Sequence, residues 1–242
     1  MKQLFAILLM LCAAPVRADD LVVFAAASLK GPLDAIAADF GGVVVSYAGS
    51  GTIARQVSFG APADVVLLAN VAWMDDLVAR DAVDPTTVVD FASNALVIVG
   101  QAHATPLDLT PDALMAALGE GRLAMGNTAS VPAGIYGKAA LELLGLWAVA
   151  APRLAEVENV RAALALVARG EVPLGLVYQS DARVVPDLPV VAQLPASAHP
   201  TIRYVGAAVS DDPHAKAFLA AVVAAEDTLT AAGFCPVGGC AE

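Results

Sequence analysis

The sequence has few charged residues, and cations are the scarcer kind. Asp, Glu, Lys and Arg make up 15% of the 242 residues, and 24 acids outnumber 13 Lys and Arg, for a formal net charge of −11. Nucleic acid partners require clustered Lys and Arg, so this balance excludes them. Any anion bound by this chain must be held by local dipoles and hydrogen bonds, because the overall field repels it.

Long apolar runs are missing after the first eighteen residues. Lys2 precedes an apolar stretch at 4–11, and VRA at 16–18 offers the cleavage positions of a secretory signal peptide, predicted to span residues 1–18. Its removal takes away Lys2 and Arg17 and no acid, which changes the net charge from −11 to −13. We therefore expect a protein exported to the periplasm, without membrane insertion after cleavage.

Cysteine and histidine are also scarce. Outside the predicted signal peptide the cysteines are Cys235 and Cys240, in CPVGGC. In an oxidising compartment this pair predicts a disulfide contributing about 2 kcal/mol, and the alternative is two free thiols on a frayed tail. His103, His199 and His214 are scattered without metal-ligand spacing, so no site with direct cation ligands is expected.

What the chain does contain is a repeated strand-to-helix junction. LVVFAAAS runs into a helix at Ser28, VVVSYAGS does so at Ser50, and further helices open at VPAGIYGKAALELLG and ENVRAALALVARG. A helix start offers unpaired N–H groups and the positive end of a dipole, which suits an anion. GSG at 49–51 is not the nucleophile-elbow pattern, and several such starts without a shared acid or base indicate binding rather than catalysis.

Strands and helices alternate along the chain, which predicts an α/β fold with mostly parallel sheets flanked by helices. Residues 122–125 are interpreted as entering a loop. Ligands collect at the carboxyl ends of strands in such sheets. Because the junctions fall in an early and a middle cluster, we expect two lobes facing a cleft. The predicted lobe I is 19–99 plus 203–242, and lobe II is 100–202.

An ordered set of segments resembles one known family. VVFAAASL, YAGSGTIARQV, GAPADVVLLAN, VPAGIYGKAAL, NVRAALALVARGEVPLGLVYQSDA and a terminal GF are similar to the periplasmic molybdate-binding proteins of ABC transporters, in order over 21–234. The resemblance implies a two-lobed type II periplasmic binding protein fold with the ligand in the interlobe cleft. It also implies a monomer without a cofactor that captures molybdate or tungstate for a membrane permease and its ATPase.

The resemblance also implies a ligand set, which the chemistry of the anion suits. Ser28 and Ser50 would each give a hydroxyl and an N–H group, Ala133 and Val160 backbone N–H groups, and Tyr178 its phenol. Molybdate near neutral pH is a dianion with four acceptor oxygens and no proton, so a cavity of donors satisfies it. Hydrogen phosphate needs an acceptor for its proton, and these five positions hold no carboxylate, so weak phosphate binding is expected.

Alternative interpretations exist for the residues and for the function. The two serines could be ordinary helix caps, and Tyr178 could be a tyrosine at the edge of the core. Arg55 and Arg161, beside the matched positions, are expected to pair with acids rather than contact the ligand. The same fold could serve sulfate or ferric ion. An exported hydrolase using one of the serines is the remaining alternative.

Overall fold

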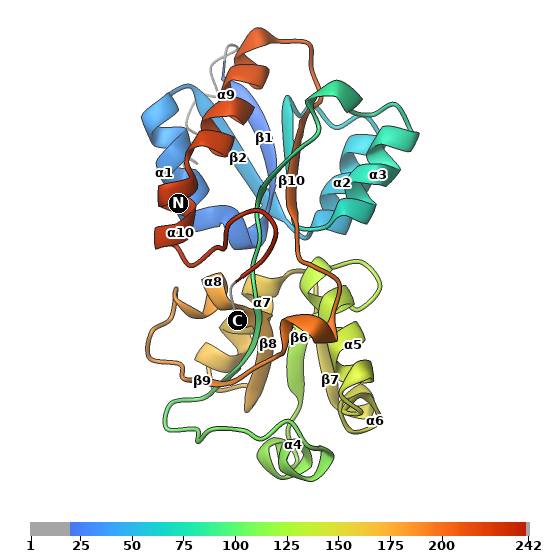
Figure 1. Cartoon of the computed structure of the whole chain (residues 1–242), viewed down its shortest axis with the longest axis vertical. Coiled ribbons are helices and arrows are strands. Elements are labelled where there is room, and N and C mark those ends of the chain that lie inside the picture. The colour runs from blue at the N-terminus through green and yellow to red at the C-terminus, as the bar shows by residue number, and fades with distance from the viewer. Residues whose placement is uncertain (1–19, 241–242) are drawn as a thin grey trace, which may run out of the picture.

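The computed structural model describes residues 20–240, and the predicted signal peptide 1–18 lies outside them. The chain forms two lobes stacked end to end, each built on one five-stranded sheet with helices on both faces (Figure 1). The strand orders are β2-β1-β3-β10-β4 in the first lobe and β7-β6-β8-β5-β9 in the second. Within 20–240, no helix has the length and apolarity needed to cross a bilayer.

The strands are short and largely buried. β3, β5, β6, β8 and β10 are buried at every position, as expected for strands covered by helices on both faces. The ten strands are β1 (Leu21–Ala26), β2 (Val43–Ala48), β3 (Val65–Leu68), β4 (Val89–Ala92), β5 (Leu96–Gly100), β6 (Leu123–Gly126), β7 (Leu154–Val157), β8 (Leu174–Tyr178), β9 (Val190–Gln193) and β10 (Tyr204–Ala208).

The helices cover the sheets with apolar faces and present polar faces to solvent. In α1, for example, Leu33, Ile36 and Ala37 are buried, a spacing that follows the helical period. The helices are α1 (Lys30–Phe40), α2 (Ser50–Ser58), α3 (Val71–Ala79), α4 (Pro111–Leu118), α5 (Pro132–Leu143), α6 (Trp147–Ala150), α7 (Val160–Ala168), α8 (Gln179–Ala182), α9 (Pro213–Ala224) and α10 (Glu226–Ala231).

Both sheets are mixed. The pairs β1–β2, β1–β3, β6–β7 and β6–β8 are parallel, and the pairs that involve β10 or β5 are antiparallel. This refines the expectation of mostly parallel sheets. β5 and β10 are the strands that follow the two crossings between the lobes, so each enters its sheet from the interlobe side, against the direction of its neighbours.

The lobe boundary lies earlier than the sequence suggested. β5 pairs with β8 and β9 in the second sheet, so the segment 96–99, which the prediction placed in lobe I, is a strand of lobe II. The first crossing is therefore at Ser93–Ala95, between β4 and β5. The second leads from β9 to β10, where the predicted return to lobe I at residue 203 adjoins the start of β10 at Tyr204.

Candidate functional site

The five residues expected to hold a ligand line one cavity between the lobes. Its volume is about 10 Å³, close to the least that one water molecule needs and far below the volume that an organic ligand needs. Among the described residues, those lining it include no Asp, Glu, Lys, Arg or His. They are Ala26, Ala27, Ser28, Ala48, Gly49, Ser50, Ala69, Val131, Pro132, Ala133, Asn159, Val160 and Tyr178.

Ser28 lies in a short 3-10 turn, Ala27–Leu29, where the chain leaves β1 for α1. Its side chain is 1% exposed and its Oγ lies 2.8 Å from the hydroxyl oxygen of Tyr204, the first residue of β10. The N-cap positions here are Ala26 and Leu29, so the interpretation of Ser28 as a helix cap is wrong. Its hydroxyl belongs to a buried polar pair at the carboxyl end of β1.

Ser50 is the first residue of α2, directly after Gly49 at the N-cap position. Its hydroxyl does not cap the helix but accepts a hydrogen bond from the backbone N–H of Ala69, at 3.1 Å. Ala69 follows β3, so this bond ties the end of one strand to the helix that follows another. Because Ser50 accepts from Ala69, its own proton remains available to an acceptor in the cavity.

Ala133 and Val160 stand at helix starts in the second lobe. Ala133 follows Pro132 in the first turn of α5, and Val160 is the first residue of α7. Backbone N–H groups at these positions have no acceptor within their own helix, and the helix dipoles add positive potential. Asn159 caps α7, its side chain accepting from the backbone N–H of Ala162 at 2.9 Å.

Tyr178 ends β8 and is 1% exposed. Its hydroxyl is buried and has no hydrogen-bond partner among the residues that the structure describes. Burial raises the pKa of Tyr178 well above its ordinary value, so the phenol keeps its proton at neutral pH. A buried donor without a partner is costly, so it is expected to acquire one from a bound group.

An ion pair lies directly behind the cavity. Arg161, the second residue of α7, places Nε 2.5 Å from Oδ1 of Asp181, a fully buried side chain in α8. Burial raises the pKa of Asp181 to about 6, against the opposing effects of Arg161 and the backbone N–H of Tyr178. Arg161 thus pairs with an acid, as expected, whereas Arg55 donates to the hydroxyl of Thr52 instead, at 3.3 Å.

Several hydrogen bonds cross from one lobe to the other. Arg161 Nη2 donates to the carbonyl oxygen of Ser28, Asn70 Nδ2 to the hydroxyl of Tyr136, and Trp73 Nε1 to the carbonyl oxygen of Ser130, each at 3.1 Å. These bonds join the 3-10 turn after β1, the β3–α3 junction and α3 in lobe I to lobe II. The structure therefore describes a closed arrangement of the lobes.

Gly49 and Gly51 permit this close approach. A Cβ atom at Gly49 would lie 2.4 Å from the carbonyl oxygen of Glu158, and one at Gly51 would lie 2.4 Å from that of Ser130. Both oxygens belong to the opposite lobe, and real Cβ atoms do not come this near. The absence of a side chain at these two glycines therefore allows the lobes to meet this closely.

Sequence reasoning did not identify the residues behind the ligand-facing positions. Tyr204, Asn94 and Asp181 are all buried and polar or ionisable, and each lies within one hydrogen bond or ion pair of a predicted site residue or its partner. Asn94 lies in the first crossing and Tyr204 directly follows the second, and the alternation of strands and helices does not reveal where these crossings are. The sequence feature that could have identified Asp181 is its position three residues after Tyr178, a predicted site residue.

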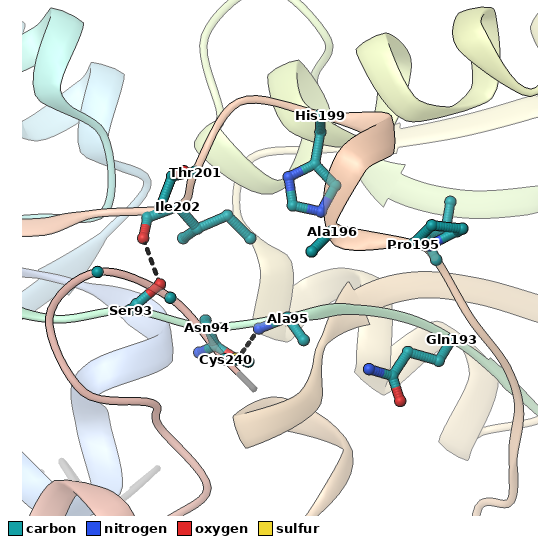
Figure 2. Close-up of a pocket in the computed structure, with 13 residues that line it drawn as sticks. Ser93, Asn94, Ala95, Gln193, Pro195, Ala196, His199, Thr201, Ile202 and Cys240 are labelled. Carbon is teal, nitrogen blue, oxygen red and sulfur yellow. Dashed lines mark hydrogen bonds between the residues drawn. The ribbon is translucent and has the colours of Figure 1, made fainter. Parts of the chain in front are cut away.

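A larger cavity, of about 560 Å³, lies at the crossings and holds none of the five predicted residues (Figure 2). The disulfide between Cys235 and Cys240 borders it, with Cα atoms 5.0 Å apart. Ser93 pairs with the backbone of Cys235 and donates its hydroxyl to the carbonyl oxygen of Ile202, at 2.6 Å. The C-terminal tail is thereby attached to both crossings. Residues 20–240 contain no cluster of His, Cys, Asp and Glu that could hold a metal cation.

Comparisons with known proteins identify the family of this chain. Residues 21–235 match the model of the bacterial extracellular solute-binding protein family. The molybdate-binding protein ModA of Escherichia coli is 43% identical over 208 residues, which cover 82% of this chain and 81% of that protein.

Two solved structures share the fold. The periplasmic molybdate-binding protein of Azotobacter vinelandii superposes with a TM-score of 0.77 at 23% identity, covering 89% of this chain and 98% of that one. The sulfate-binding protein SubI of Mycobacterium tuberculosis superposes with a TM-score of 0.74 at 18% identity, covering 90% and 87%. On the match over 21–235 and the identity to its relatives, the chain belongs to the bacterial extracellular solute-binding protein family.

Proposed function

We propose that this protein captures molybdate, and tungstate with it, in the periplasm and delivers it as a monomer to an ABC permease and its ATPase. The observation that carries the proposal is the cavity between the lobes, which both lobes line with hydroxyl and backbone N–H donors and without a charged side chain. The name of the E. coli relative, a molybdate-binding protein, supports the same cargo.

The donors suit a fully deprotonated tetrahedral anion. We infer that the hydroxyls of Ser28, Ser50 and Tyr178 and the N–H groups at Ala133 and Val160 together surround its four oxygens. Hydrogen bonds to a charged acceptor contribute about 1.5–3 kcal/mol each, so five or more support sub-micromolar affinity even after ordering costs. The anion would bridge Ser28 and Ser50 in one lobe to the other three residues in the second.

Sulfate is the second candidate cargo, because a sulfate-binding protein shares the fold. It carries the same charge as molybdate and needs the same donors, so only the size of the closed cavity separates the two. A hydrolase is disfavoured by the partners of the serines. Ser28 contacts a tyrosine hydroxyl and Ser50 a backbone N–H, and neither partner can act as a general base.

Isothermal calorimetry with molybdate, tungstate, sulfate and phosphate tests the proposal. The expected result is one-to-one binding of molybdate and tungstate at sub-micromolar Kd, with sulfate and phosphate far weaker. Heat with sulfate alone would retain the fold and change the cargo. Micromolar or tighter binding of phosphate would contradict the donor-only cavity, and no binding of any of the four anions would overturn the proposed function.

A further inference from the structure

Ser28 is the end of a chain of buried hydrogen bonds that begins at the first crossing between the lobes. Asn94, 4% exposed, lies in that crossing between β4 and β5, where Figure 2 shows its side chain beside Ala95. Its amide contacts the hydroxyl of Tyr204, which in turn lies 2.8 Å from Ser28 Oγ. The hydrogen-bond partners of Asn94 and Tyr204 fix the direction in which each proton points along this chain.

The orientation of the Asn94 amide is fixed by backbone groups. Its Oδ1 accepts from the N–H of Ala95 at 3.0 Å and from the N–H of Ser180 at 3.4 Å. A backbone N–H can only donate, so the oxygen must occupy that side of the amide. Nδ2 therefore faces the other way, where it donates to Ser180 Oγ at 2.7 Å and to the hydroxyl oxygen of Tyr204 at 3.4 Å.

The direction of the bond between Tyr204 and Ser28 follows. Tyr204 is fully buried, and among residues 20–240 the groups within hydrogen-bond distance of its hydroxyl are the Asn94 amide nitrogen and Ser28 Oγ. Since Nδ2 has no free lone pair, Ser28 Oγ is the acceptor for the Tyr204 proton. The reverse arrangement, with Ser28 donating, would leave the Tyr204 proton buried without an acceptor.

Because Ser28 Oγ accepts from Tyr204, its own hydroxyl proton is not used in that bond. Ser28 can therefore donate this proton into the cavity between the lobes. We propose that Asn94 and Tyr204 are specificity-determining positioning residues, which force Ser28 to present a donor, and not an acceptor, to the bound oxyanion. This rests on the proposed function of the cavity and deepens it. Every oxygen of a fully deprotonated anion can accept the Ser28 proton. The O–H group of a protonated oxyanion would instead face the Ser28 O–H group, and neither would have an acceptor.

We call the hydrogen bonds from Asn94 through Tyr204 to Ser28 the relay. One isosteric substitution is expected to reverse the direction of its hydrogen bonds. In Asn94→Asp the Nδ2 position becomes a carboxylate oxygen, which accepts from Tyr204. Tyr204 then accepts from Ser28, and a lone pair of Ser28 faces the cavity. Asn70→Asp is the matched control, because Asn70 is also buried, at 6% exposed, and lies near the cleft, but contacts Tyr136 and Trp73 rather than the relay. Both variants add one negative charge.

The readout is the ratio of the Kd for inorganic phosphate to the Kd for molybdate, measured by calorimetry at about pH 8, where phosphate is mainly the hydrogen phosphate dianion. Both anions then carry two charges, so repulsion by the new carboxylate cancels in the ratio. We expect Asn94→Asp to lower the ratio at least about tenfold and Asn70→Asp to leave it within about twofold. An unchanged ratio in Asn94→Asp, or an equal fall in both variants, would overturn the relay.

Neutron diffraction from deuterium-exchanged crystals of the unsubstituted protein is the second measurement, and it serves if Asn94→Asp does not fold. The relay predicts a deuteron on the Tyr204 oxygen directed at Ser28 Oγ. A Ser28 deuteron directed at Tyr204 would overturn it. The two proposals fail separately: absence of binding to every oxyanion overturns the proposed function, while normal molybdate binding with the reversed deuteron overturns the relay alone.

Discussion

At the residue scale, the three hydroxyl side chains of the cleft differ in how their hydrogen-bonding capacity is used. Ser50 accepts from a backbone N–H, and Ser28 lies against the hydroxyl of Tyr204. Tyr178 has no partner among the described residues. A buried hydroxyl without a partner lowers stability, so the Tyr178 hydroxyl destabilises the ligand-free protein. A ligand that accepts its proton is expected to remove this cost.

Tyr178→Phe separates these two effects. We expect molybdate affinity to fall roughly 10- to 100-fold, because one hydrogen bond to the anion is lost. Thermal stability without ligand should equal or exceed that of the unsubstituted protein, since the removed hydroxyl has no partner. Calorimetry and thermal melts measure the two quantities.

Tyr136→Phe is the matched control for that substitution. Its hydroxyl accepts from Asn70 across the lobes, so its loss should lower the stability by about 1 kcal/mol. A Tyr178→Phe protein that loses stability to the same extent and keeps its affinity would contradict the role assigned to Tyr178.

Asp181 gives the stability a pH dependence of known sign. Burial raises its pKa to about 6 in the folded protein, from 3.8 in the unfolded chain. Between these values the unfolded chain releases the proton and the folded protein keeps it. The contribution of Asp181 to stability is therefore fully present below the unfolded value and is lost as pH rises from about 4 to 6.

Asp181→Asn removes that dependence. The stability of the variant minus that of the unsubstituted protein should increase across this pH range, by an amount on the order of 2–3 kcal/mol. Urea unfolding at several pH values measures the difference. A flat difference would show that the carboxylate titrates at its ordinary pKa in the folded protein, and a decrease would show that its pKa is lowered; either contradicts the expectation.

At the scale of elements, the site is made where strands end and helices begin. β1, β3 and β8 end at the cleft, and α2, α5 and α7 begin there. The first turn of α2, which carries Ser50, lies against backbone carbonyl oxygens of the opposite lobe at Gly49 and Gly51. We therefore expect a side chain at either glycine to obstruct closure.

Gly51→Ala tests this expectation. Its Cβ would meet the carbonyl oxygen of Ser130 at 2.4 Å and the Trp73 ring at 2.9 Å, so the lobes must stay further apart. Molybdate affinity should fall by more than about tenfold, because the closed state becomes less populated. X-ray scattering should show less compaction at saturating molybdate than in the unsubstituted protein.

Gly31→Ala is the control, in α1, where a Cβ would meet nothing within 4 Å. It should bind normally and compact fully at saturating molybdate, because the added Cβ lies clear of the opposite lobe. Normal affinity and full compaction in Gly51→Ala would contradict the role of this glycine in closure.

Sequence reasoning located most elements but not all of them. The junctions at Ser28 and Ser50 and the helices that carry Ala133 and Val160 follow from apolar periodicity and turn residues. Residues 122–125 were interpreted as entering a loop, but Leu123–Gly126 form β6, which pairs in parallel with β7 and β8 and lies buried between them. The antiparallel entry of β5 and β10 depends on where the chain crosses between lobes, which local patterns do not encode.

At the scale of the whole molecule, three segments meet between the lobes: the two crossings and the C-terminal tail. Ser93 joins them, through its backbone pairing with Cys235 and its hydroxyl bond to Ile202. The disulfide closes the tail into a loop beside both crossings. The tail therefore restrains the segments about which the lobes would move.

Replacing both cysteines, Cys235→Ser with Cys240→Ser, should lower the stability by about 2 kcal/mol, because a short loop in the unfolded chain is released. The molybdate stoichiometry should stay at one, since neither cysteine lines the interlobe cavity. Chemical unfolding and calorimetry check the two expectations. Unchanged stability would mean that the disulfide contributes nothing to the stability of the folded state.

The central claim is that one tetrahedral dianion lies between the lobes, held by donors from both. The most direct test is a crystal structure with tungstate, in which anomalous scattering locates the metal. The account predicts a single tungsten peak in the cavity lined by Ser28, Ser50, Ala133, Val160 and Tyr178, within hydrogen-bonding reach of both lobes through its oxygens. A peak in the larger cavity at the crossings, or one contacted by a single lobe, would contradict it.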